Sequence, residues 1–388
     1  MLARLLQAVI LLFGVGLSCP SQATLTLAYS LKNSEFASFL TESAATQGLA
    51  IDAQWVDQKL LKVRLIQSAE SGARADAILV PADHLGMDEF VNFSEIPQSM
   101  LSPEQSPLFA ASGRMQGRQL GIPIVAGNHL VLYYNKGLII EPATSWQQLI
   151  QYYQQHGKAP IGWSFMEMFW FVPFVTAFGE PPLVTDQPNL NTKAMHQALE
   201  YVWSLAEQGV VDPKCDYSCS EQRFMSAKLP YTINGIWAYD NYRHGLGDQL
   251  GVAALPRLAG NTMKPYSTAF VLAFPEQSLH GEKRAQLEQL AALLQHPGVQ
   301  TQLWQRYVGI PVHKQVQKNI LAHADADSQV FFETLAQSEP MPNSPNMMIL
   351  WEVMLKGYTR FGAKAMNAQQ AGEFMQHLAE RSIAPRKE

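Results

Sequence analysis

Residues 76–81, Asp76-Ala77-Ile78-Leu79-Val80-Pro81, decide the fold class, because a short apolar run that ends in proline is typical of a buried strand. Upstream, residues 25–29 and 50–55 have the β-rich pattern of two further strands. The stretches between them, 34–48 and 57–71, carry apolar side chains in sets that indicate helices. Strands that alternate with helices predict a parallel sheet in an α/β domain.

Asp83 and His84 follow the last of these strands directly. In open α/β sheets, ligands bind beyond the C-terminal ends of the strands, so both side chains are expected near a binding site. A single aspartate after a strand also serves as a turn or cap residue, and that second role stays open for Asp83.

The N-terminus is predicted to be a cleaved signal peptide, residues 1–23. Arg4 supplies a positive charge, an apolar stretch follows over 5–17, and Ser21-Gln22-Ala23 has the small residues of a cleavage site. The apolar stretch is too short to span a bilayer, which takes about 20 residues. Cys19 leaves a lipid anchor as the alternative, although Gly16 stands where lipoprotein signals usually have leucine. A periplasmic location is the expectation.

Length and composition predict a two-domain globular protein. The chain has 388 residues, which exceeds the roughly 250–300 residues at which single cores stop growing. It is 47% hydrophobic and 16% charged, with a net charge of −5 and no basic block, so nucleic acid is excluded as an expected partner. Further elements are predicted in five segments: a strand and turn over 121–135, and helices over 145–156, 192–208, 281–296 and 366–382.

Cys215 and Cys219 are the two cysteines that remain once residues 1–23 are removed. Two cysteines in an oxidising compartment are expected to pair, so a disulfide is predicted. The enclosed loop is very short, so the bond would fix one local turn and add little global stability. Zinc ligation is the alternative, but zinc takes four ligands and no second pair stands at a matching spacing.

Five segments in order resemble the extracellular solute-binding proteins of ABC importers (family 1), which include the periplasmic maltose-binding protein. The segments are Leu132-Tyr133-Tyr134-Asn135-Lys136, Pro142-Ala143-Thr144-Ser145-Trp146, residues 231–238, residues 251–256 and Met341-Pro342-Asn343-Ser344-Pro345. The resemblance implies an α/β fold of two lobes, a monomer that closes on ligand between them and is recognised by a membrane permease. It divides the chain into an N-terminal lobe, 24–126 with 268–320, and a C-terminal lobe, 127–267 with 321–388.

The resemblance also implies a set of ligand-binding residues. A sugar needs flat aromatic surfaces for its C–H faces and hydrogen-bonding groups for its hydroxyls. The positions that match the family's contacts are Asp83, Asn128, Glu167, Phe169, Trp237, Tyr239 and Trp351. For each aromatic residue among them, a place in the hydrophobic core is the alternative role.

Several positions depart from the maltose-binding pattern. Phe169 lacks a tyrosine hydroxyl, and Asn128 stands in place of a glutamate. Val80 replaces a tryptophan, His84 an arginine, and Glu352 a tyrosine. These departures argue against maltodextrin as the ligand and favour a different sugar.

Other functions remain to be weighed. The sequence has no Gly-x-Ser-x-Gly elbow, no His-Glu-x-x-His and no Walker-type phosphate loop, so no enzyme, cofactor or metal site is predicted. A binding protein for another solute stays open: a phosphate ester would use cations such as Arg243, and a metal could use Tyr133 and Tyr134. Strand alternation is expected to bury one of these two tyrosines and expose the other. A ligand-sensing receptor is the third alternative.

Overall fold

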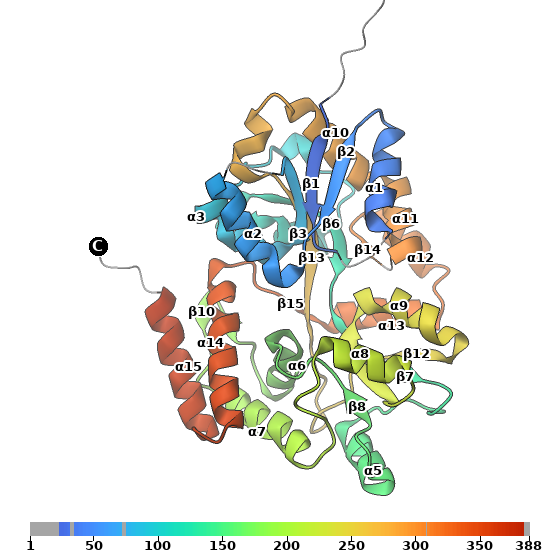
Figure 1. Ribbon diagram of the computed structural model, residues 1–388, viewed down its shortest axis with the longest axis vertical. Coiled ribbons are helices and arrows are strands. Elements are labelled where there is room, and N and C mark those ends of the chain that lie inside the picture. The colour runs from blue at the N-terminus through green and yellow to red at the C-terminus, as the bar shows by residue number, and fades with distance from the viewer. Residues whose placement is uncertain (1–22, 32–34, 72–74, 308, 384–388) are drawn as a thin grey trace, which may run out of the picture.

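Figure 1 shows a computed structural model with two lobes, each built of a β-sheet and helices. The structure describes residues 23–31, 35–71, 75–307 and 309–383. The predicted signal peptide and its alternative lipid site, Cys19, lie outside the described residues. Within the described ranges, no helix is both long enough and apolar enough to cross a membrane.

The described residues form a first sheet of seven strands, in the order β14-β6-β13-β3-β1-β2, with β15 pairing with β13. Its strands are β1 (Leu25–Tyr29), β2 (Ile51–Trp55), β3 (Ala77–Pro81), β6 (Gly121–Gly127), β13 (Tyr266–Ala273), β14 (Ile310–Pro311) and β15 (Glu339–Pro340). β1 pairs in parallel with both β2 and β3, as the alternation of strands and helices predicts. β13 enters antiparallel between β3 and β6, from a point almost 200 residues further along the chain.

Helices lie on either side of this sheet in the upper half of Figure 1. They are α1 (Phe36–Ala45), α2 (Gln58–Ser71), α3 (Asp88–Val91), α4 (Pro107–Ala110), α10 (Arg284–Gln295), α11 (Pro297–Tyr307) and α12 (Lys314–Leu321). Short 3₁₀ helices complete the group: η1 (Ala82–Met87), η2 (Gln98–Met100), η3 (Ala111–Gly113) and η6 (Pro275–His280). β3 is buried along its whole length, which explains its unbroken apolar sequence.

A second sheet, in the order β12-β7-β11-β8, lies in the lower half of Figure 1. Its strands are β7 (Leu130–Asn135), β8 (Ile161–Gly162), β11 (Tyr231–Gly235) and β12 (Leu250–Ala253). β7 lies between β11 and β12, and both Tyr133 and Tyr134 are buried. The expectation that one of them is exposed is wrong, because this strand is covered on both faces.

The second sheet is surrounded by α5 (Trp146–His156), α6 (Met168–Phe178), α7 (Lys193–Glu207), α8 (Tyr217–Met225), α9 (Tyr239–Leu246), α13 (Ala326–Gln337), α14 (Pro345–Gly362) and α15 (Ala368–Ile383). Two 3₁₀ helices, η4 (Ile236–Ala238) and η5 (Gly247–Gln249), flank α9. Two short hairpins lie outside the main sheets: β4 (Arg114–Met115) with β5 (Arg118–Gln119), and β9 (Leu183–Val184) with β10 (Gln187–Pro188). α5 begins at Ser145, whose hydroxyl accepts from the Gln148 N–H, and ends at the left-handed Gly157.

The chain passes between the two groups of elements more than once. It leaves the first sheet after β6, returns to it at β13, and joins the second group again at α13 after β14 and α12. The hydroxyl of Tyr239 donates to Asp327 at 3.0 Å, which ties α9 to α13. The lobe boundaries given in the sequence analysis stay a prediction.

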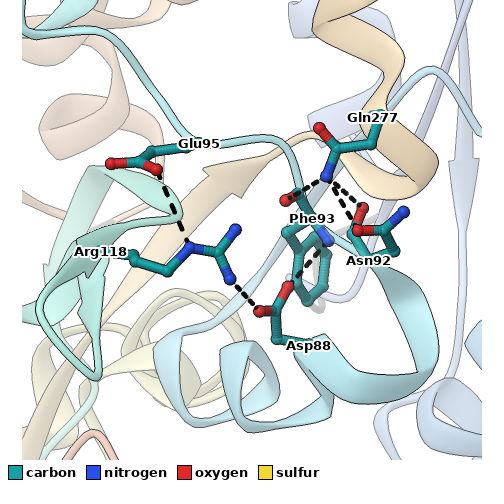
Figure 2. A network of polar contacts seen from close by, with 6 residues as sticks. All are labelled: Asp88, Asn92, Phe93, Glu95, Arg118 and Gln277. Atoms are coloured by element: carbon teal, nitrogen blue, oxygen red, sulfur yellow. Dashed lines mark hydrogen bonds and ion pairs between the residues drawn. The ribbon is translucent and has the colours of Figure 1, made fainter.

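A polar network in the first lobe joins α3 and the residues that follow it to β5 and to η6 (Figure 2). The Asp88 carboxylate accepts from the Phe93 N–H at 2.9 Å and pairs with Arg118 at 2.6 Å. The side-chain amide of Gln277 donates to the Asn92 carboxamide oxygen and to the Phe93 carbonyl, both at 2.9 Å. Asn92 and Gln277 both have positive φ, and these bonds hold the two left-handed residues together.

His129 lies in the short link between β6 and β7 and is completely buried. Neither ring nitrogen has a well-formed hydrogen bond within the described part of the chain. Burial lowers the pKa of His129 to about 4, and the nearby carbonyls of Phe331 and Gly127 only partly offset this. The imidazole is therefore neutral in the folded protein at neutral pH.

We expect the free energy of unfolding to fall as pH drops from about 6.5 to about 4. Over this range the unfolded chain protonates His129 while the folded chain does not, and the loss amounts to on the order of 3 kcal/mol. Urea unfolding at pH 7, 5.5 and 4.5 measures the loss in the wild type and in His129→Gln, which should show a smaller pH dependence. His244→Gln is the control, because its side chain is 80% exposed. Equal pH dependence in the wild type and His129→Gln would contradict the prediction.

Candidate ligand-binding site

The site is built around α6, a helix that is apolar on almost every side. Most of its residues are buried, which is what a helix without a polar face requires. The indole Nε1 of Trp170 donates to the Ile233 carbonyl at 2.9 Å, so α6 is tied to β11. Phe169, the preceding residue, is only half-buried. Near its start, α6 thus presents an aromatic ring that is only partly covered.

Trp237 lies in η4, directly after β11, and is also half-buried. Its ring folds back over Gly235, where a Cβ would come within 1.9 Å of a ring carbon. The indole Nε1 donates to the hydroxyl of Tyr217 at 3.2 Å. A glycine at 235 is therefore required for Trp237 to take this position.

Trp351 comes from α14, in the second turn of the helix after its N-cap at Ser344. Its ring is half-buried and lies 6.1 Å from the ring of Tyr266 in β13. Glu352 follows it and is exposed, and its carboxylate pairs with Lys62 of α2 at 3.6 Å. This exposed pair links the first lobe to the helix that carries Trp351, and such pairs contribute little energy by themselves.

The three rings meet in one group, which we call the aromatic cluster: Phe169, Trp237 and Trp351, with Trp170 and Tyr217 behind them. The ring of Phe169 lies 6.2 Å from Trp237 and 6.4 Å from Trp351. Trp170 stands edge-on to Trp237 at 6.0 Å. Burial raises the pKa of Tyr217, and Glu221 adds to this effect, so its hydroxyl stays protonated at neutral pH. Partly exposed rings in contact make a surface on which apolar faces of a ligand can stack.

Glu167 supplies an exposed carboxylate at the start of α6. It stands at the N-cap position of this helix, two residues before Phe169. Its backbone N–H donates to the Ser164 carbonyl at 3.0 Å, which shapes the turn that leads into the helix. A carboxylate so placed can accept hydrogen bonds from ligand hydroxyls.

The remaining predicted contacts lie on other segments. Asp83 is in η1, which packs against the N-terminal part of α14, and its carboxylate lies 3.3 Å from Nδ1 of His84. Asn128 has positive φ and is half-buried in the link between β6 and β7. The ring of Tyr239 stacks edge-on against Phe331, while its hydroxyl bonds Asp327.

Two cavities lie away from the aromatic cluster. One, of about 500 Å³, lies beside the β4–β5 hairpin and is lined by Glu95, Ile96, Pro97, Gln98, Arg114, Gly117 and Gln119. The other, of about 370 Å³, lies between α7 and the end of α14, against Trp203 and Phe361. Among the described residues, no group of three or more His, Cys, Asp or Glu side chains is arranged to hold a metal ion.

A family model for bacterial extracellular solute-binding proteins matches residues 62–330. The chain belongs to this family. The fold is also that of the maltose/maltodextrin-binding domain MalE from Bdellovibrio bacteriovorus, solved bound to maltotriose. The two superpose with a TM-score of 0.84 over 94% of this chain and 100% of the other, at 22% sequence identity. The predicted two-lobed α/β fold and the resemblance to this family are confirmed.

In this solute-binding protein, the structure brings together three of the seven predicted contact residues, Phe169, Trp237 and Trp351, and Glu167 lies two residues before Phe169. Trp170 and Tyr217 also belong to the cluster and were not predicted as part of the site. Tyr217 could have been noticed, because it lies inside the predicted Cys215–Cys219 loop. The disulfide itself is present, with a sulfur–sulfur distance of 2.00 Å, so the zinc alternative is excluded at these cysteines.

Gly235→Ala is expected to displace the Trp237 ring from its place in the solute-binding protein. Gly235 has ordinary extended backbone angles, so the change acts through the added methyl group alone. Crowding of this kind costs about 1–3 kcal/mol of stability. The indole N–H signal of Trp237 in a ¹⁵N spectrum should move, and thermal unfolding should shift modestly downward. Gly281→Ala, where a Cβ meets only ordinary contacts, is the control; an unmoved Trp237 signal in Gly235→Ala would argue against the geometry described.

Proposed function

We propose that this protein captures a neutral sugar or oligosaccharide for an ABC importer in the periplasm, and that it acts by binding and not by catalysis. The aromatic cluster is the observation that carries the proposal. Phe169, Trp237 and Trp351 come from three different elements, yet their half-buried rings lie in contact. Exposed apolar patches often mark binding sites, and rings from three elements offer such a surface to the apolar face of a sugar.

The charges near the cluster favour a neutral ligand with many hydroxyls. Glu167 precedes Phe169 by two residues, and the proposal makes its carboxylate and that of Asp83, from the first lobe, polar contacts for the ligand. Two carboxylates would accept from sugar hydroxyls and repel an anion. Arg243, the cation considered for a phosphate ester, instead bonds the Gly247 carbonyl at 3.0 Å and Asp248 at 3.2 Å.

The similar protein from Bdellovibrio supports a carbohydrate, since it was solved with maltotriose. Maltotriose itself is less favoured here, because Val80 is completely buried in β3 where the maltose-binding pattern has a tryptophan. Glu352 likewise places a carboxylate beside Trp351 where that pattern has a tyrosine. The proposal therefore names a sugar other than a maltodextrin, with Asn128 and Tyr239 as further contacts.

Trp237→Ala should weaken sugar binding by about 2–4 kcal/mol, because it removes one stacking surface. Glu167→Gln keeps the shape and weakens one acceptor, so it should cost less, about 1–2 kcal/mol. The experiment is titration calorimetry of the mature protein against a panel of mono- and oligosaccharides, phosphate esters and divalent metals. Trp203→Ala, a half-buried tryptophan of the second lobe beside the cavity between α7 and the end of α14, is the control and should bind like the wild type.

These measurements distinguish a wrong ligand class from a wrong role for Trp237. Tight binding only to phosphate esters or to metals would overturn the sugar assignment while leaving the solute-binding role. If Trp237→Ala unfolds the protein while Trp203→Ala does not, Trp237 belongs to the core and the aromatic cluster is not a stacking surface.

We also expect the two lobes to move together when sugar binds. The chain passes between them more than once, through links such as residues 128–129, and a hinge of this kind allows closure around a ligand. Solution X-ray scattering should show a smaller radius of gyration at saturating sugar than without it. A radius that does not change at saturation would contradict the proposed closure.

A further inference from the structure

We propose that Tyr217 is a positioning residue for Trp237 and that the Cys215–Cys219 disulfide holds Tyr217 in place. The inference rests on the proposed function, because it assigns this pair of features a role in the binding of solute by the aromatic cluster.

The disulfide encloses the start of α8. Asp216 is the N-cap and its carboxylate accepts from the Cys219 N–H at 2.9 Å. Tyr217 is the first residue of the helix, so it lies between the two cysteines. The Cys215 carbonyl lies 3.5 Å from the N–H of Phe165, in the segment that leads to Glu167 and α6. The turn closed by the disulfide thus contacts the loop that leads into α6.

Tyr217 contacts the cluster at two points. Its hydroxyl accepts from the Trp237 indole at 3.2 Å, and its ring stands edge-on to Trp170 at 6.1 Å. Tyr217 therefore holds the indole of Trp237 and packs against the tryptophan beside it.

A bond that closes so short a loop contributes little to global stability through chain entropy. Its local effect is larger, because it restricts the backbone on both sides of Tyr217. Without it, the first turn of α8 would depend on the Asp216 cap and on backbone hydrogen bonds such as that from the Ser220 N–H to the Asp216 carbonyl. The Tyr217 hydroxyl would then be held less firmly at its distance from the indole. This contrast between local and global effects makes the proposal testable.

The test uses the mature full chain with ¹⁵N-labelled tryptophan, and its sugar probe is the saccharide of the calorimetric panel above that the wild type binds most tightly. Tyr217→Phe removes the hydroxyl and keeps the ring, and the double variant Cys215→Ala/Cys219→Ala removes the bond. The matched control is Tyr201→Phe, a half-buried tyrosine of the same lobe that stands edge-on to another tryptophan, Trp146. The Trp237 indole N–H signal is recorded without sugar, and affinity is measured by calorimetry.

The proposal predicts that the Trp237 signal moves in Tyr217→Phe and in the double variant but not in Tyr201→Phe. Loss of one hydrogen bond at the stacking ring should weaken binding of that saccharide by about two- to tenfold. An unmoved Trp237 signal in the double variant, with or without a lower unfolding temperature, would show that the disulfide holds the turn without positioning Trp237 and would overturn the proposal. If the wild type binds no saccharide of the panel, the proposed function fails, and the signal without sugar still decides whether Tyr217 positions Trp237.

Discussion

The burial of α6 is the constraint on which the rest of the site depends. A helix with apolar residues on nearly all sides is stable only when other elements cover it, and α7, β13 and α14 pack against it. Trp170 must then find a partner for its indole N–H, and the carbonyl of Ile233 provides it. These packing requirements fix the direction in which Phe169 projects, and so they fix where Trp237 and Trp351 can meet it.

The two lobes contribute unequally to the proposed site. The stacking rings and Glu167 come from elements packed around the second sheet, whereas Asp83 and Lys62 come from elements of the first. The lobe built on the second sheet therefore carries the aromatic surface by itself. The first lobe adds polar groups at its edge, where a small relative motion changes their distance from a ligand. This arrangement suits a protein that must both hold and release its solute.

The sequence predicted those features that depend on local pattern. Residues 76–81 and 25–29 have the apolar content of buried strands, and the helix over 145–156 has clear start and stop signals at Ser145 and Gly157. α6 was not predicted as a helix, because its uniformly apolar residues show no 3.6-residue period. Contact between Phe169 and Trp351, which are far apart in the chain, depends on tertiary packing alone. Motif resemblance pointed to these rings, but only the packing shows that they touch.

The placement of β13 has a consequence for how the protein forms. Ser278, just beyond β13, bonds the backbone of Asp76 across 202 residues of sequence. During synthesis, β3 therefore has no partner on one edge until nearly half of the chain has followed it. Pairings of such long range form slowly, and an open apolar edge invites association with other chains in the meantime. The first lobe, although it begins the sequence, is thus completed only after most of the second has been made.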